Sequence, residues 1–267
     1  MARSTGSGFV DFIPPLHECL DLYDRTKPST EQPKNDAADR TKAIPKGFID
    51  AMTVRREVFV DEQHVPLENE LDDDDSKSYH WVAYASEAYK GSLTPIGTIR
   101  LVPPPYSHSP HSASAGAQPK TAGVLNGDAR RDSTFAHDGK EAYIKLGRMA
   151  VIPRYRKQGI SKLLINSALD YAAEFPHRMM PYLESTAIEA VKVAGFGAAI
   201  EWKGLVLLHA QVGVQKLYRK YGFETDESMG VWDEEGIDHV GMWRRLELRP
   251  TRKPSLSKTA SSPEVSP

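Results

Sequence analysis

The sequence has one cysteine, no long apolar run and almost no net charge. Cys19 is the only cysteine among 267 residues, which excludes an intrachain disulfide and a zinc site built on several thiolates. The longest apolar stretches, residues 193–200 and 204–210, are too short to span a bilayer. A formal net charge of −2 gives no general attraction to nucleic acid or to an anionic membrane. We therefore expect a protein that binds neither.

Targeting and glycosylation signals are also missing from the sequence. The N-terminus has no apolar stretch of signal-peptide length, and no asparagine stands in an N-x-Ser/Thr sequon. These features favour a reduced intracellular protein, located in the cytoplasm with the nucleus as an alternative.

Three stretches are poor in periodic apolar residues, namely 24–46, 103–139 and the segment after 250. Such composition buries too little surface to offset the entropy of an ordered chain. We expect a partly flexible N-terminal segment (1–45), one folded domain (46–249) with a flexible insert (103–139), and a disordered tail (250–267). His108 and His111 lie in the insert, and we expect no metal site there or elsewhere.

Between these stretches the apolar residues follow helix and strand periods. Helices are predicted at 47–59, 159–175, 182–193 and 214–221, with Gly222 as a left-handed cap after the last one. Strands are predicted at 79–85, 96–102, 142–152, 205–210, 228–233 and 238–246. The fold class is therefore mixed α/β, without an internal repeat.

The densest chemical signal is a strand, a basic loop and a helix across residues 144–175. Gly159 opens the helix and removes a side chain where the backbone must approach a ligand. The new helix offers unpaired N–H groups and the positive end of its dipole, which suit an anion such as a pyrophosphate. Further positive charge comes from Arg154, Arg156, Lys157 and Lys162. The nucleotide-binding motifs GxxxxGK[ST] and GxGxxG are absent, and a basic helix N-terminus without a ligand remains the alternative.

The segment Val151–Ser161, V-x-P-x-Y-R-x-x-G-I-S, resembles motif A of the GNAT acetyltransferase superfamily. The resemblance implies a mixed, mostly antiparallel sheet, splayed at its middle with helices on both faces. It also implies that acetyl-CoA is the co-substrate, with its pyrophosphate on the loop and its pantetheine arm along the preceding strand. Ser161 stands where the family has Gly or Ala. The implied CoA-binding residues are Met149, Ala150, Val151, Arg156, Lys157, Gln158, Gly159, Ile160 and Ser161.

Other segments are similar to the ElaA-like branch of the same superfamily. They are R-x-x-V-F-V-x-E-Q at 55–63, Leu71-Asp72, His80, the run at 209–223 and EEGIDHVGM at 234–242. The resemblance covers roughly residues 46–246. The insert at 103–139 and extra helical material near 176–203 depart from it, and both are expected to shape the substrate entrance.

Acetyl transfer to an amine needs a donor for the departing thiolate, a polarised carbonyl and a proton acceptor. The resemblance implies that Tyr218 faces the sulfur, although spacing alone also fits a core tyrosine. It implies that a backbone N–H near Met149–Val151 holds the carbonyl oxygen. Tyr221 is expected to pack.

The general base is left open among Glu62, His80 and His239, each of which lies in a segment of the ElaA-like pattern. An imidazole that titrates near neutrality suits this role. A chain of water molecules, or a purely structural role for each side chain, fits the sequence equally well.

The acidic run Asp72–Asp75 fails the EF-hand pattern, because Lys77 and Ala83 occupy the glycine and glutamate positions. It is expected to be a solvated loop. If it borders the acceptor site, Asp72 and Asp73 would attract a cationic amine.

These observations predict transfer of an acetyl group from acetyl-CoA to a primary amine, on a small molecule or a protein, in a ternary complex. The alternatives are another acyl group or a CoA-binding or protein-interaction module without turnover. A homodimer is a further expectation, because the late strands of GNAT proteins often pair between subunits.

Overall fold

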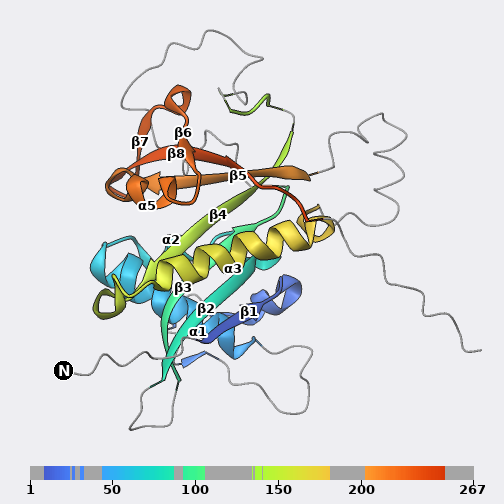
Figure 1. Cartoon of the computed structure of the whole chain (residues 1–267). Helices are drawn as coiled ribbons and strands as arrows, with labels where there is room; N and C mark the ends of the chain where they lie inside the picture. The colour runs from blue at the N-terminus through green and yellow to red at the C-terminus, as the bar shows by residue number, and fades with distance from the viewer. Residues whose placement is uncertain are drawn as a thin grey trace, which may run out of the picture.

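The structure is a computed structural model that describes residues 9–24, 26–27, 31–32, 44–86, 93–105, 134, 136–139, 141–180 and 202–249. These residues form an eight-stranded sheet in the order β1-β2-β3-β4-β5-β8-β6, with β7 paired to β8. The strands are β1 Phe9–Ile13, β2 Tyr79–Ser86, β3 Leu93–Val102, β4 Ala142–Val151, β5 Trp202–Gln211, β6 Glu224–Thr225, β7 Val231–Glu234 and β8 Ile237–Arg245. Every pairing is antiparallel except β4 with β5. The sheet has two halves, β1–β4 and β5–β8, and Figure 1 shows β4 at the boundary, next to β5.

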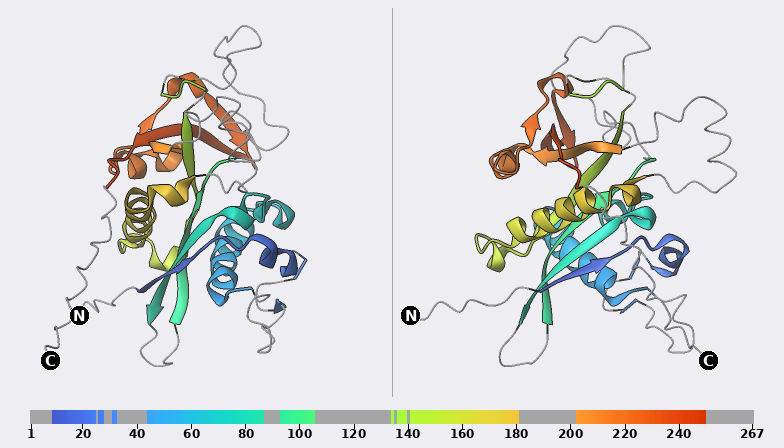
Figure 2. Two further views of the ribbon diagram at one scale, coloured as in Figure 1. Left: turned by 90° about the vertical axis from the view of Figure 1, so that its right-hand side faces the viewer. Right: turned by 45° about the vertical axis from the view of Figure 1, so that its right-hand side comes forward.

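Helices cover both faces of the β1–β4 half, as Figure 2 shows for α1 (Lys46–Arg55) and α3 (Ile160–Glu174). Strand alternation assigns each face its own core. Trp81 in β2 packs in the cluster with α3, whereas Val82 packs in the cluster with α1. The predicted mixed fold with helices on both faces is confirmed.

The remaining helical segments are short. They are a π-helix at Arg56–Glu62, α2 at Leu67–Glu70, α5 at Gln215–Arg219, and 3-10 turns at His17–Leu22, Asp75–Lys77, Pro153–Tyr155, Pro176–Met179, Val212–Val214 and Glu227–Met229. None of the helices among the described residues is long and apolar enough to cross a bilayer.

Several predicted boundaries move. The helix predicted at 47–59 is α1 only to Arg55 and then widens into the π-helix. The strand predicted at 228–233 begins later, at Val231, after a 3-10 turn. Gly222, with a φ of 74°, is the predicted left-handed residue after α5. The helix predicted at 182–193, together with His108 and His111, lies outside the described residues.

Two segments assigned to flexible regions are partly packed. Strand β1, in the N-terminal segment, forms the sheet edge beside β2. At the end of the 103–139 insert, the His137 ring is only 5% exposed and stacks on Trp243 with centroids 5.2 Å apart. Pattern reasoning misses both because neither segment is long enough to show a period.

Candidate active site

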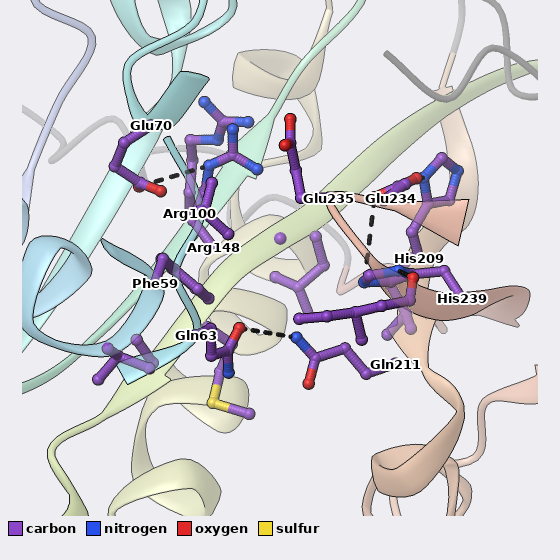
Figure 3. Close-up of a pocket in the computed structure, with 18 of the residues that line it drawn as sticks. Phe59, Gln63, Glu70, Arg100, Arg148, His209, Gln211, Glu234, Glu235 and His239 are labelled. Atoms are coloured by element: carbon purple, nitrogen blue, oxygen red, sulfur yellow. Dashed lines mark hydrogen bonds and ion pairs between the residues drawn. The ribbon is translucent and has the colours of Figure 1, made fainter. Parts of the chain in front are cut away.

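The site lies where the two halves of the sheet separate. Strands β4 and β5 pair as far as Leu146 and Leu208. Beyond that point Gly147–Val151 pair only with β3, and His209–Gln211 pair only with β8. A cavity of about 940 Å³ occupies the opening, and Figure 3 shows side chains from both halves facing it.

A β-bulge distorts β4 at the cavity. Gly147 pairs with Arg100 and Ala150 with Thr98, so Arg148 and Met149 together oppose the single residue Ile99. A bulge of this kind re-aims the backbone of its strand. Met149, Ala150 and Val151, which follow the bulge or belong to it, line the cavity.

The basic loop connects β4 to α3. Lys157 and Gly159 have φ angles of 62° and 86°, so the chain turns sharply before α3 begins. No side chain of the described residues caps this helix N-terminus, and its first turn contains no acidic residue. Its N–H groups and dipole therefore remain available to an anion.

Arg156 fixes the loop. Its guanidinium Nε donates to the Val151 carbonyl oxygen at 2.9 Å, and Nη1 donates to Glu62 Oε1 at 2.7 Å. The hydrogen bond from Arg156 lowers the pKa of the Glu62 carboxyl. Glu62 therefore ties the π-helix to the loop and does not line the cavity, so the structure gives it a loop-anchoring role and corrects the prediction of a base at this position.

The other implied CoA-binding residues fall into two groups. Met149, Ala150, Val151, Arg156 and Ser161 line the cavity. Lys157, Gln158, Gly159 and Ile160 form the adjoining loop and first helical residue, outside the cavity lining.

Tyr218, in α5, also lines the cavity and is 7% exposed. Burial raises the pKa of its hydroxyl, which therefore stays protonated and able to donate at neutral pH. Tyr221 lies outside the cavity lining and packs on the main core, as expected.

A carboxylate and two imidazoles meet on the β5–β8 side of the cavity (Figure 3). His209 Nδ1 lies 2.9 Å from Glu234 Oε1, and His239 Nδ1 lies 2.8 Å from the Ile237 carbonyl oxygen. A carboxylate and a carbonyl only accept, so both rings carry a proton on Nδ1. In the neutral form of each ring, Nε2 is therefore the atom that can accept a proton. The Nε2 atom of His239 lies 4.0 Å from Glu234 Oε2.

Burial alone would raise the pKa of Glu234. The hydrogen bond and charge of His209, the charge of His239 and the indole N–H of Trp232 outweigh it and lower that pKa to about 2. Glu234 is therefore ionised at neutral pH and can stabilise positive charge on either imidazole.

His80, one of the predicted base candidates, lies elsewhere. Its ring is fully buried against Phe48, with Nε2 3.5 Å from the Asp75 carbonyl oxygen. Burial lowers its pKa to about 3. Because no atom of His80 reaches the cavity, the structure gives it a packing role and corrects the prediction.

The acidic run is not a solvated loop. Asp75 is fully buried and accepts from Arg55 Nη1 at 2.7 Å, while Asp72 pairs with Arg100 and Arg148. Burial opposes ionisation of Asp75, but Arg100 and Arg55 hold its pKa well below the usual range. Of the four aspartates only Asp73 is exposed.

Sequence reasoning missed several residues that line the cavity. Lys145 is one of these residues, and burial lowers the pKa of its amino group to about 8. Gln211 Nε2 donates to Gln63 Oε1 at 3.0 Å and links the end of β5 to the residue that follows the π-helix (Figure 3). The sequence similarity includes His209 and Glu234 only as the first residues of the segments 209–223 and 234–242, without a role of their own. His209 could have been identified as a candidate site residue because it is a single histidine in the otherwise apolar strand 205–210.

Comparisons with known proteins point to one family. The model of the acetyltransferase (GNAT) family matches residues 48–197. The uncharacterized N-acetyltransferase YjcF of Bacillus subtilis is 31% identical over 136 residues, which are 49% of this chain and 89% of YjcF.

Among solved structures, Escherichia coli ElaA has a TM-score of 0.44 and 16% identity, with coverage of 89% of this chain and 100% of ElaA. A putative N-acetyltransferase from Lactobacillus plantarum has the same TM-score and 20% identity, with coverage of 76% and 93%. From the family match over more than half of its length, the chain belongs to the GNAT acetyltransferase family of acyl-CoA-dependent N-acyltransferases.

Proposed function

We propose that the protein transfers an acetyl group from acetyl-CoA to a primary amine by direct attack of the amine in a ternary complex. The observation that carries the proposal is a single cavity that reaches both Arg156 of the basic loop and the Glu234–His209 pair. Tyr218 and the bulged part of β4 border the same cavity. The residues proposed to bind the donor and to accept the proton thus border one cavity.

The loop residues fit a pyrophosphate. A β-carbon added at Gly159 would meet no atom of the part of the chain that the structure describes within 4 Å, so open space lies beside this helix end. In this proposal the Gly159–Ser161 amides and the nearby Arg and Lys side chains hold the diphosphate of acetyl-CoA. The β4 backbone at Met149–Val151 holds the carbonyl oxygen.

The cluster of Glu234, His209 and His239 takes the proton from the amine. Among the described residues, His209 Nε2 has no hydrogen-bond partner, and an unpaired acceptor of this kind gains from an incoming donor. The amine nitrogen bonds to the carbonyl carbon, the carbon–sulfur bond breaks, and the Tyr218 hydroxyl donates to the departing sulfur. Separate His209→Ala and His239→Ala variants identify which imidazole receives the proton.

Two measurements test the proposal. Titration calorimetry reports CoA binding, and a thiol-release assay with acetyl-CoA and a panel of amines (a polyamine, an aminosugar, lysine and a lysine peptide) reports turnover. We expect binding and amine-dependent release. CoA binding without release from any acyl-CoA would instead identify a binding module, and release only from a longer acyl-CoA would identify another acyl group.

A further inference from the structure

Arg148 has a backbone conformation that needs support. It is the first of the two bulge residues of β4 and has a φ of 48°. A residue with a β-carbon is strained in the left-handed region, and such strain persists only where the surroundings impose it. The surroundings of the Arg148 side chain therefore matter for the path of β4.

The side chain of Arg148 is held by the segment around α2. Its Nη2 donates to Asp72 Oδ2 at 3.0 Å, and Nη2 lies 3.4 Å from the Asn69 carbonyl oxygen. Its Nε lies 3.6 Å from Glu70 Oε1. These groups all belong to residues 69–72, far from Arg148 in sequence.

Asp72 is itself anchored in the core. Arg100, on the strand next to β4, donates from Nη1 to Asp72 Oδ1 at 2.6 Å and from Nη2 to Asp72 Oδ2 at 2.9 Å. Arg100 also pairs with Asp75 at 2.8 Å, and Asp75 pairs with the fully buried Arg55 of α1. A continuous chain of charged hydrogen bonds thus runs from α1 to the bulge, and bidentate pairs of this type fix geometry.

We propose that Asp72 and Arg148 are positioning residues that hold the β4 bulge in the conformation needed for catalysis. This inference rests on the proposed function, in which the β4 backbone after the bulge holds the carbonyl oxygen. Neither residue needs to contact the reacting atoms. Their role is to keep the Met149 and Ala150 backbone in one orientation, because a misdirected donor loses its effect on the transition state.

Glycine offers a matched test at position 148. Gly accepts a φ of 48° without strain, whereas Ala keeps the β-carbon and loses the ion pair. We expect Arg148→Ala to lower kcat about a hundredfold, the order of loss for one misplaced donor, with the KM for acetyl-CoA unchanged. Arg148→Gly should recover most of that loss. Equal losses in the two variants, or a loss confined to a raised KM for the amine, would overturn the proposal in favour of a substrate contact by Arg148.

Asp72→Asn tests whether Asp72 acts on the bulge through its ion pair with Arg148. In the wild-type background we expect a fall in kcat of roughly tenfold or more. In the Arg148→Gly background the further fall should stay within about twofold, the scatter seen between independent sites. An equally large fall in both backgrounds would show that Asp72 acts without Arg148.

Thermal unfolding separates this inference from the proposed function. Wild type that releases no thiol would refute the function, but the order of melting temperatures still tests the bulge. We expect Arg148→Ala to melt below Arg148→Gly. The opposite order would refute the strain argument whether or not the enzyme is active.

Discussion

Glu234→Gln is the sharpest single test of the charged cluster. The pKa of Glu234 falls from 4.5 to about 2, and its side chain is 22% exposed. At about 1.4 kcal/mol per pH unit, the ionised carboxylate contributes up to about 3 kcal/mol to stability. Gln retains some hydrogen bonding, so we expect a loss at pH 6 of about 1–3 kcal/mol.

The pH dependence follows from the direction of the pKa change. Because folding depresses the pKa of Glu234, its contribution is complete above pH 4.5 and is lost as the pH falls toward 2. His209, His239 and Trp232 are the groups that lower it. The difference in unfolding free energy between wild type and variant, measured in urea, should therefore be larger at pH 6 than at pH 3.

The same substitution tests the proton-accepting role. Gln cannot supply a negative charge to an imidazolium, and its amide favours the wrong tautomer of His209. We expect kcat in the thiol-release assay to fall about a hundredfold, while CoA binding in calorimetry is retained.

Glu224→Gln is the matched control, because Glu224 is exposed on β6 and lies outside the cavity lining. It should change neither stability nor kcat. A stability difference for Glu234→Gln that is the same at pH 6 and pH 3 would refute the charge argument, and an unchanged kcat would refute the role of Glu234 in proton transfer.

Three further substitutions test separate parts of the structure. Tyr218→Phe should lower kcat about tenfold to a hundredfold without weakening CoA binding; parallel losses of kcat and of binding in calorimetry would point to packing instead. Gly159→Ala places a β-carbon at a φ of 86°, which costs about 1 kcal/mol. It should weaken CoA binding several-fold, and unchanged affinity would mean that the loop does not contact CoA. Arg55→Met removes the fully buried cation that pairs with Glu70 and Asp75, which then keep Arg148 at 3.6 Å and Arg100 at 2.8 Å, respectively, and should cost about 3–5 kcal/mol in urea unfolding. A cost below about 1 kcal/mol would show that the remaining arginines and water compensate these charges.

The sequence by itself determined the features that depend only on residues close together along the chain. The period of apolar residues in α3 and the strand before it places that helix against the sheet, and Gly159 marks its start. Gly222 likewise marks the turn after α5, because glycine adopts a positive φ without strain. Local backbone preference and side-chain periodicity are both written in a short stretch of chain.

Only the tertiary structure decided which charged and polar groups meet. Glu234 reaches His209 across 25 positions, and Asp72 reaches Arg148 across 76. Such pairs depend on strand register, on the separation of β4 from β5 and on the bulge, none of which a local pattern specifies. Burial likewise gave His80 a packing role and made the acidic run an internal anchor, because the exposure of a polar residue depends on what folds over it.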